Sequence, residues 1–468
     1  MIGFLAGLGL AKTGFSFGWA FTIISGVVMC VALPKKNLIT LVLVGIFGGM
    51  LGLMRGHTAW QGLHAYDDYY RKKIVVQGKA LSDSTYGKFS QIEFELGSIK
   101  IIDGNAQKPM IGKLLINGFG APMVYRGDIV QVEGKLLTIR GGRQGVIGFA
   151  NMRVVGHNLP WYETARLRFM SGLESSLPEP IASFGLGILI GQKTGIPQAT
   201  SDQLSRVGLT HLIAVSGYNL TILIQAARRL GGKRSKYQST ILSILLIGLF
   251  LLFSGLSASI VRAAIVSLLS LGAWYYGRAF RPTVLLLLSA VFTAGFYPVY
   301  LWSDIGWWLS FLAFFGVIVV GPMLTARVYK DKKPNAIVAL LIESFSAQLM
   351  TIPIIMFIFG NVSLISLAAN AMVVPLVPLA MLLTLVAGLG GMFMSSLAGW
   401  FAWPGRLLLT YMLDVIGLFS RVPKMYLHIL IDASTMLYMY GLVLGILGLW
   451  WHKVAPHYAK ITEINSQI

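Results

Sequence analysis

Long runs of apolar residues, separated by short polar loops, make up most of this chain. A helix needs about 20 mostly apolar residues to cross the hydrocarbon core of a bilayer. Runs of about this length with few or no charges occur at 15–33, 38–54, 209–227, 239–256, 258–276, 283–301, 305–325, 336–359, 364–389 and 433–451. No charged residue occurs between Ser344 and Gly405, so a further short or re-entrant piece fits at 392–403. The pattern predicts a polytopic α-helical membrane protein with about ten spans.

The pattern changes between residues 55 and 160, where hydropathy falls and short alternating runs appear. Such runs are typical of β-strands. The candidate strands are 74–80, 91–96, 99–102, 113–116, 128–137 and 145–155, with turn sequences at 103–105, 126–128 and 140–142. About six short strands suit a small closed or half-closed barrel that removes its own sheet edges. An OB-like barrel is our first choice.

The two patterns together divide the chain into five parts. They are N-terminal transmembrane helices at 1–54, an inserted OB-like β domain at 55–160, an amphipathic connector at 161–205, a helical membrane domain at 206–452 and a short basic tail at 453–468. Hydrophobic residues make up 55% of the 468 residues and charged residues 12%, against roughly 45–50% and 25% in a soluble chain. This composition excludes a soluble enzyme and a disordered chain. The single cysteine, Cys30, excludes an intrachain disulfide.

The positions of the basic residues give an orientation, because short loops rich in Lys and Arg stay in the cytoplasm. Thirteen of the 38 Lys and Arg residues lie in four loops, at 35–36, 228–236, 278–281 and 327–333. Counting the predicted spans between these loops places all four on one side of the membrane and residues 55–160 on the other. Most of the formal net charge of +20 therefore reflects topology.

The β domain has its own basic excess, with 14 Lys and Arg against 8 Asp and Glu, a net charge of +6. Basic side chains among tyrosines can follow a phosphate backbone and stack bases. The candidates for DNA contact are Arg71, Lys72, Lys73, Lys79, Lys88, Arg140 and Arg143. The alternative is an ordinary basic surface, with residues 71–73 resting on lipid headgroups.

Polar side chains within the predicted spans are costly to keep in a membrane, so each is a functional candidate. The densest group lies at 208–220, where a Ser-Gly pair offers a place to loosen the helix. The candidates for lining a path are His211, Ser216, Gly217, Asn219, Ser259, Arg262, Asp304, Ser310, Glu343, Gln348 and Asn370. Because they recur on several spans, they favour a lined pathway over a plain scaffold.

Each of these residues also has a structural interpretation. His211 and Asn219 could hydrogen-bond to a neighbouring span. Arg262 could snorkel to the outer surface, and Asp304 could simply cap a helix. Glu343 would need a water-filled cavity or an arginine partner to stay charged.

Several motifs in the second half of the chain occur in a fixed order. Residues 208–219 read GLTHLIAVSGYN, followed by SIVRA at 259–263, DIG at 304–306, LSFLA at 309–313 and QLMTIP at 348–353. In order and spacing these motifs resemble the ComEC competence family, the inner-membrane channels for DNA uptake in natural transformation. The resemblance covers about residues 183–389.

This resemblance implies a channel in the bacterial inner (plasma) membrane that translocates single-stranded DNA into the cytoplasm, with an extracytoplasmic OB-like domain at 55–160. It also implies a separate DNA receptor, a nuclease and a cytoplasmic helicase as partners, besides membrane lipid. Many relatives end in a metallo-β-lactamase-like domain. This chain stops soon after its last span, and its seven His residues show no metal-ligand spacing. We therefore expect no enzymatic activity, no metal and no cofactor.

Two other classes of protein stay open from the residues alone. One is a secondary transporter or lipid flippase in which His211, Asp304 and Glu343 relay protons, although no inverted repeat is evident. The other is an intramembrane enzyme, but no nucleophile and base stand at a recognisable spacing. The sequence does not indicate an oligomeric state.

Overall fold

We describe a computed structural model of the full chain. The described residues are 1–13, 19–32, 37–86, 91–103, 106–118, 123–138, 143–157, 159–192, 194–213, 219–220, 224, 235–277, 281–330, 332 and 334–466. The chain divides into two compact units. The first unit comprises Met1–Leu167 and Leu287–Trp307, and the second comprises Arg168–Leu286 and Trp308–Ile468.

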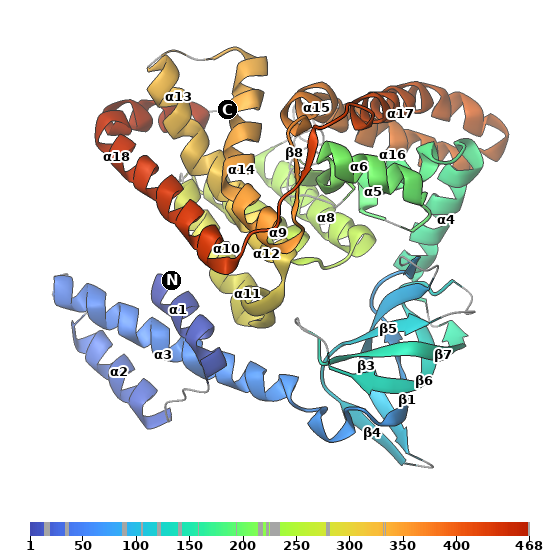
Figure 1. The fold of residues 1–468 in the computed structure, drawn as a ribbon, viewed down its shortest axis with the longest axis horizontal. Coiled ribbons are helices and arrows are strands. Elements are labelled where there is room, and N and C mark those ends of the chain that lie inside the picture. The colour runs from blue at the N-terminus through green and yellow to red at the C-terminus, as the bar shows by residue number, and fades with distance from the viewer. Residues whose placement is uncertain are drawn as a thin grey trace. The chain divides into compact units, whose positions relative to one another are not determined.

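Three apolar helices open the first unit (Figure 1): α1 (Ile2–Leu10), α2 (Trp19–Ala32) and α3 (Leu38–Leu63). Helices α1 and α3 pack through glycines. A Cβ atom on Gly3 would lie 2.2 Å from the carbonyl oxygen of Gly45, and one on Gly7 would lie 1.9 Å from that of Gly49. Small residues let the backbones of membrane helices approach this closely. The close approach of α1 and α3 therefore requires glycine at positions 3 and 7.

The β domain follows α3 and contains β1 (Lys73–Ala80), β2 (Thr85–Tyr86), β3 (Ile92–Asp103), β4 (Ala106–Met110), β5 (Leu114–Gly118), β6 (Asp128–Leu137) and β7 (Gly145–His157). Strand β1 pairs with both β3 and β6, so the pairings run β1–β6–β7–β5–β3 and return to β1. The pair β5–β7 is parallel, and the other pairs are antiparallel. Inward side chains such as Val76, Phe94 and Leu136 form one buried core.

One strand prediction was wrong. The runs 91–96 and 99–102 belong to a single strand, β3, which pairs with β1 across a register shift between Gln77 and Lys79. Ser98 has a φ of +49°, and an irregularity of this kind bends a strand without ending it. Strand β4, which pairs with β3, was not predicted.

The first unit also contains the end of α10 (Pro282–Phe296), α11 (Val299–Ser303) and the start of α12 (Ile305–Phe315). The predicted span 283–301 is interrupted at Pro298, because proline lacks an N–H group and disfavours helix in the preceding residue. Arg55 Nε and Nη2 donate to the carbonyl oxygens of Gly295 and Phe296, each at 2.8 Å. Trp302 Nε1 donates to the Leu8 carbonyl oxygen at 2.9 Å. We call residues 295–303, from the end of α10 through α11, the α10–α11 link. These bonds hold the link against α1 and α3.

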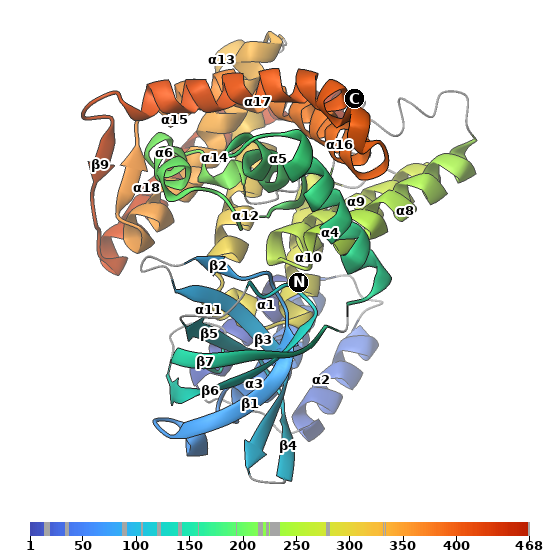
Figure 2. The same ribbon diagram turned by 90° about the vertical axis from the view of Figure 1, so that its right-hand side faces the viewer.

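The second unit is helical (Figure 2). Its helices are most of α4 (Trp161–Ser176), α5 (Ile181–Ile190), α6 (Gln198–Val207), α8 (Lys236–Ser254), α9 (Ala258–Tyr275), the rest of α12, α13 (Gly321–Tyr329), α14 (Ala336–Ile358), α15 (Ser366–Val373), α16 (Val377–Phe393), α17 (Ala398–Ser420) and α18 (Ala433–Ser466). Strand β8 (Asn361–Ser363) pairs with β9 (Tyr426–His428). Strand β8 precedes α15 and β9 follows α17, so this pairing brings the two ends of the α15–α17 segment together.

The predicted connector at 161–205 consists of α4, α5 and α6. Helix α5 is apolar on all sides, and its residues from Ala182 to Ile190 are buried. It ends at Gly191, whose φ of +74° is a left-handed conformation that suits glycine. Helix α4 crosses α16 where a Cβ atom on Gly391 would lie 2.0 Å from the carbonyl oxygen of Gly172. The middle of the connector is thus part of the helical core.

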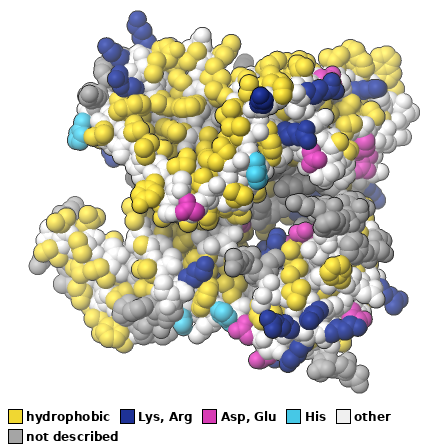
Figure 3. Space-filling model, viewed as in Figure 1, with side chains coloured by type: hydrophobic (Ala, Val, Ile, Leu, Met, Phe, Trp, Pro, Cys, Tyr) yellow, Lys and Arg dark blue, Asp and Glu magenta, His cyan; other side chains and the backbone are white. Residues whose placement is uncertain are grey.

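Among the described residues, seven helices are long and apolar enough to cross a membrane. They are Leu38–Tyr69, Lys236–Ser254, Ala258–Tyr275, Ile305–Tyr329, Ala336–Ile358, Ser366–Phe393 and Ala433–His452. They match seven of the predicted spans and confirm a polytopic helical membrane protein. The helix within 283–301 is shorter than predicted. The described part of 15–33 is helical from Trp19 to Ala32, and most of 209–227 lies outside the described residues. Figure 3 shows hydrophobic side chains spread over the helical surfaces, as lipid contact requires.

Candidate functional site

Three of the predicted site residues meet in the second unit. Arg262 Nε donates to Ser310 Oγ at 2.8 Å, and the hydroxyl oxygens of Ser259 and Ser310 are 2.9 Å apart. The central carbon of the Arg262 guanidinium lies 4.9 Å from the ring centroid of Phe314 and 5.6 Å from that of Phe311. We call these five residues the Arg262 cluster.

Local structure explains how α9 and α12 form this cluster. The link between α8 and α9 contains Gly255, whose φ of +85° and ψ of 179° suit glycine. Ser257 then caps α9 by accepting a hydrogen bond from the backbone N–H of Ile260 at 3.5 Å. Ser259 and Arg262 are three residues apart and therefore share a face of α9. That face meets the face of α12 that carries Ser310.

The Arg262 side chain lies inside the helical unit. The residue is 7% exposed, so it does not snorkel to the surface. Among the described residues, no carboxylate lies within 4.0 Å of its guanidinium. A buried charge is costly unless it is paired and hydrogen-bonded. A guanidinium in this setting can bind a phosphate or carboxylate through strong charge-assisted hydrogen bonds.

The polar group at 208–220 is described only in part. His211 lies in a short 3-10 turn, Thr210–Leu212, with an exposed side chain. Ser216 and Gly217 lie outside the described residues. Asn219 is buried, and its Nδ2 donates to the carbonyl oxygen of Ile188 at 2.8 Å. Because the last carbonyl groups of a helix have no partner within it, Asn219 stabilises the end of α5.

Asp304 is the residue that precedes α12. Its Oδ1 accepts a hydrogen bond from the backbone N–H of Trp307 at 2.9 Å. Trp307 is itself buried, and its Nε1 donates to Thr293 Oγ1 at 2.9 Å. The structural interpretation of Asp304 as a helix cap therefore accounts for its position.

The remaining membrane candidates lie on α14 and α15. The side chain of Glu343 is exposed. Gln348 Nε2 and Asn370 Oδ1 are buried and have no hydrogen-bond partner among the described residues. Buried polar atoms are nearly always paired with protein or water, so these two atoms are candidates for a hydrogen bond to a buried water or a ligand. No hydrogen bond between described residues joins them to the Arg262 cluster.

The predicted DNA-contact residues of the β domain fall into two groups, and Figure 3 shows Lys and Arg side chains gathered over this domain. Arg71 and Lys72 are exposed just before β1, and Lys79 is half-buried within that strand. Lys88 and Arg140 lie outside the described residues. Exposed cations of this kind are open to a phosphate backbone.

The other two candidates are already paired with carboxylates. Lys73 Nζ lies 2.6 Å from Glu133 Oε1. Arg143 Nη2 lies 2.8 Å from Glu95 Oε1, and Lys113 Nζ lies 3.7 Å from Glu95 Oε2. A phosphate that bound at either place would compete with the carboxylate.

A protein-family model described as "Competence protein" matches residues 188–454, which is more than half of the chain. The chain belongs to this competence protein family. The match includes the whole Arg262 cluster and confirms the resemblance seen in the motifs. ComE operon protein 3 of Bacillus subtilis (strain 168) is 30% identical over 258 residues, which are 50% of this chain and 32% of that protein. The chain thus spans about a third of the length of this curated relative. No solved structure matches the chain.

This competence protein contains a buried ion network that the sequence did not reveal, formed by Asp83, Arg126, Glu163 and Arg166. Arg166 Nη1 and Nη2 donate to the two Asp83 oxygens at 2.7 and 2.6 Å, and its Nε donates to Glu163 Oε2 at 2.8 Å. Arg126 donates from its side chain to Glu163 and from its backbone N–H to Asp83 Oδ1 at 2.9 Å. The network ties the first turns of α4 to two loops of the β domain.

The charges in this network stabilise one another. Burial alone would raise the pKa of Asp83, but the hydrogen bond and charge of Arg166, aided by Arg126, hold it below its ordinary value. Burial would lower the pKa of Arg166, but Asp83 and Glu163 raise it. Glu163 and Arg166 are an i, i+3 pair on one helix, which a sequence can suggest. Asp83 lies 83 residues from Arg166, so no local pattern could connect them.

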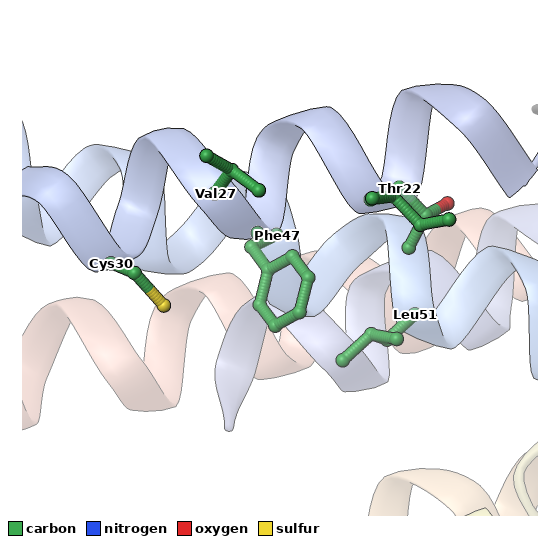
Figure 4. A pocket seen from close by; sticks show the side chains of 7 residues that line it. Thr22, Val27, Cys30, Phe47 and Leu51 are labelled. Carbon is green, nitrogen blue, oxygen red and sulfur yellow. The ribbon is translucent and has the colours of Figure 1, made fainter.

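A groove between α2 and α3 carries no such chemistry. It is lined by Thr22, Ile23, Gly26, Val27, Cys30, Phe47 and Leu51 (Figure 4). The Thr22 hydroxyl donates to Met54 Sδ at 3.1 Å, which satisfies its polar group. The lining is otherwise apolar apart from the Cys30 thiol, so the groove suits hydrocarbon chains.

Proposed function

We propose that this competence protein is an inner-membrane channel that passes single-stranded DNA into the cytoplasm during natural transformation. The observation that carries the proposal is Arg262, a buried arginine in the membrane domain whose described partners are a serine hydroxyl and two aromatic rings. A DNA strand brings one phosphate per nucleotide, and each phosphate could accept hydrogen bonds from this guanidinium in turn. An anionic substrate would gain more from such a group than an uncharged one, because charge-assisted hydrogen bonds are stronger than neutral ones.

The β domain would receive the strand as an OB-like barrel. The ring of pairings β1–β6–β7–β5–β3–β1, with β5 and β7 parallel, supports a closed five-stranded barrel. OB folds commonly bind single strands through basic grooves and aromatic side chains. The net charge of +6 at 55–160 fits this role.

The predicted orientation also supports the proposal. The charge pattern puts residues 55–160 and the α10–α11 link on the outer side of the membrane. Lys113 Nζ of the β domain lies 6.0 Å from the ring centroid of Tyr297 in that link, as two segments on one side can do. Duplex DNA is too wide for a helical bundle of this size, so a separate receptor and nuclease would supply the single strand, and a cytoplasmic helicase would draw it in.

Uptake of labelled DNA by a deletion strain that carries variants of this protein tests the proposal. We expect Arg262→Ala to lower uptake about 10- to 100-fold, since a hydrogen bond to a charged group contributes about 1.5–3 kcal/mol. Arg262→Lys should restore part of the uptake because it keeps the charge. Arg327→Ala, at an exposed arginine of α13, is the matched control. Immunoblots of the membrane fraction would verify insertion.

Normal uptake by an inserted Arg262→Ala protein would contradict the channel role of Arg262. If the deletion strain itself took up and integrated DNA normally, a transporter or flippase function would replace the proposal.

A further inference from the structure

Charged side chains at Glu95, Lys113 and Arg143 of the β domain lie close to Tyr297 and Tyr300, within the first unit. Glu95 of β3 accepts a hydrogen bond from Arg143 Nε at 2.9 Å and lies 3.7 Å from Lys113 Nζ. Lys113 Nζ lies 6.0 Å from the ring centroid of Tyr297. The rings of Tyr297 and Tyr300 are 5.4 Å apart at their centroids. We call these five residues the outer ledge.

The backbone around the outer ledge is held in place. Gln144 Oε1 accepts a hydrogen bond from the backbone N–H of Lys113 at 2.6 Å, and the Tyr70 hydroxyl donates to the Gln144 carbonyl oxygen. Gly112 has a φ of +122°, and a Cβ atom there would lie 2.1 Å from the Gln144 side chain. The backbone of Lys113 is therefore hydrogen-bonded to the side chain of Gln144, the residue that follows Arg143.

The ledge is accessible to a ligand. Tyr297 is 56% exposed, and the side chains of Lys113 and Arg143 are 42% and 36% exposed. Arg166 in the buried ion network is 3% exposed. The outer ledge thus combines an open aromatic face with two accessible cations, whereas the ion network is closed.

We propose that the outer ledge is a binding site for single-stranded nucleic acid, with Glu95 as an internal competitor for its two cations. A base stacks on Tyr297, and neighbouring phosphates bind Lys113 and Arg143 in place of the Glu95 carboxylate. This inference rests on the proposed function and assigns it a receiving site. The exposed ring favours nucleic acid over a lipid headgroup, because a base offers a planar face for stacking and a lipid phosphate does not.

The first test removes the competitor. Full-length protein in nanodiscs of zwitterionic lipid is titrated with a fluorescent 20-nucleotide oligo-dT, and binding is followed by anisotropy over a range of salt. We expect Glu95→Gln to tighten binding about threefold and to steepen the dependence of log K on log salt by about 0.7 for each cation released. A change that disrupted the fold would weaken binding instead.

Glu133→Gln is the matched control, since it removes the same charge beside Lys73 on β1 and β6. We expect it to tighten binding less than Glu95→Gln does. Equal effects would show a general charge effect, and a larger effect of Glu133→Gln would assign the strand to the Lys73 side. Either result would overturn the outer ledge.

The second test separates stacking from phosphate contact. Tyr297→Leu should weaken oligo-dT binding about tenfold, while Tyr297→Phe, which keeps the ring, should stay near wild type. With an abasic 20-mer, which keeps the phosphates and lacks the bases, Tyr297→Leu should have little effect. Equal losses with both oligomers would overturn the stacking role. If the wild-type protein binds no oligo-dT at low salt, the receiving role in the proposed function fails as well. If the protein binds oligo-dT but the changes at Glu95 and Tyr297 do not alter the affinity, the outer ledge alone is refuted.

Discussion

Arg166 in the first unit and Arg262 in the second are both buried arginines, 3% and 7% exposed. Arg166 makes hydrogen bonds to both oxygens of Asp83 and to Glu163. Arg262 donates to Ser310 and faces two phenyl rings, and within the described residues no carboxylate accompanies it. The same side chain is thus neutralised in one unit, whereas in the other it has no counter-ion among the described residues.

This difference separates a structural arginine from one that is available to a ligand. A buried guanidinium with two carboxylates has satisfied charge and geometry, so it stabilises the fold and leaves little for a ligand. A buried guanidinium with only hydroxyl and aromatic neighbours has an uncompensated charge, which a bound anion would stabilise. The contrast supports the channel proposal, and three further measurements test it.

The largest effect should come from Arg166→Met, which leaves Asp83 and Glu163 buried without their partner. Breaking one side of a buried ion pair typically costs about 3–5 kcal/mol. We expect a loss of this size in the free energy of unfolding of the full chain, measured by pulse proteolysis in urea. Arg153→Met, at an exposed arginine of β7, is the control and should change little. A loss below about 1 kcal/mol for Arg166→Met would show that the network is not structural.

Acid should weaken the same network. The pKa of Asp83 is held below its unfolded value, so its stabilising contribution is present above about pH 4 and is lost as the pH falls through the lower folded value. We expect the full chain to melt at a lower temperature when the pH is below about 4. Asp83→Asn should remove part of this dependence because the titrating group is gone. An identical pH profile for wild type and Asp83→Asn would contradict the assignment.

The smallest effect on stability should come from Arg262→Met. This change removes a buried charge with no described counter-ion, so we expect the free energy of unfolding to change by less than about 1 kcal/mol or to rise. The same pulse-proteolysis measurement allows a direct comparison with Arg166→Met. A loss of 3–5 kcal/mol would mean that Arg262 has a counter-ion in the native protein, and the contrast between the two arginines would disappear.

Much of the fold could be predicted because apolar runs and strand alternation are local. Seven predicted spans are long apolar helices, and the strand predicted at 128–137 has the predicted bounds in β6. The interruption at Pro298 carried a local signal that the span prediction overlooked. No local signal indicated that β3 continues through Ser98, since a bend and a strand end look alike in a short alternating run.

The candidate site could be predicted less well. Ser259, Arg262 and Ser310 were named from the cost of polar groups in a membrane, and the structure brings them together. Asn219 and Asp304 were named for the same reason, but they stabilise helix ends. The cap formed by Asp304 is local, and the sequence offered it as an alternative. The partners of Asn219 and Arg262 lie 31 and 48 positions away, so their contacts depend on how the helices pack.

Hydropathy, strand alternation and motif spacing are properties of neighbouring residues, so the amino-acid sequence alone predicts a polytopic membrane protein with a β-rich insertion and competence-family motifs. Three features depend on the tertiary structure: the neutralisation of Arg166 by two carboxylates, the pairing of β1 with both β3 and β6, and the position of Tyr297 beside Lys113. Those contacts join residues up to 184 positions apart, counted from 113 to 297. Side-chain pairing and burial at such separations depend on how helices and strands pack, and no local pattern encodes that.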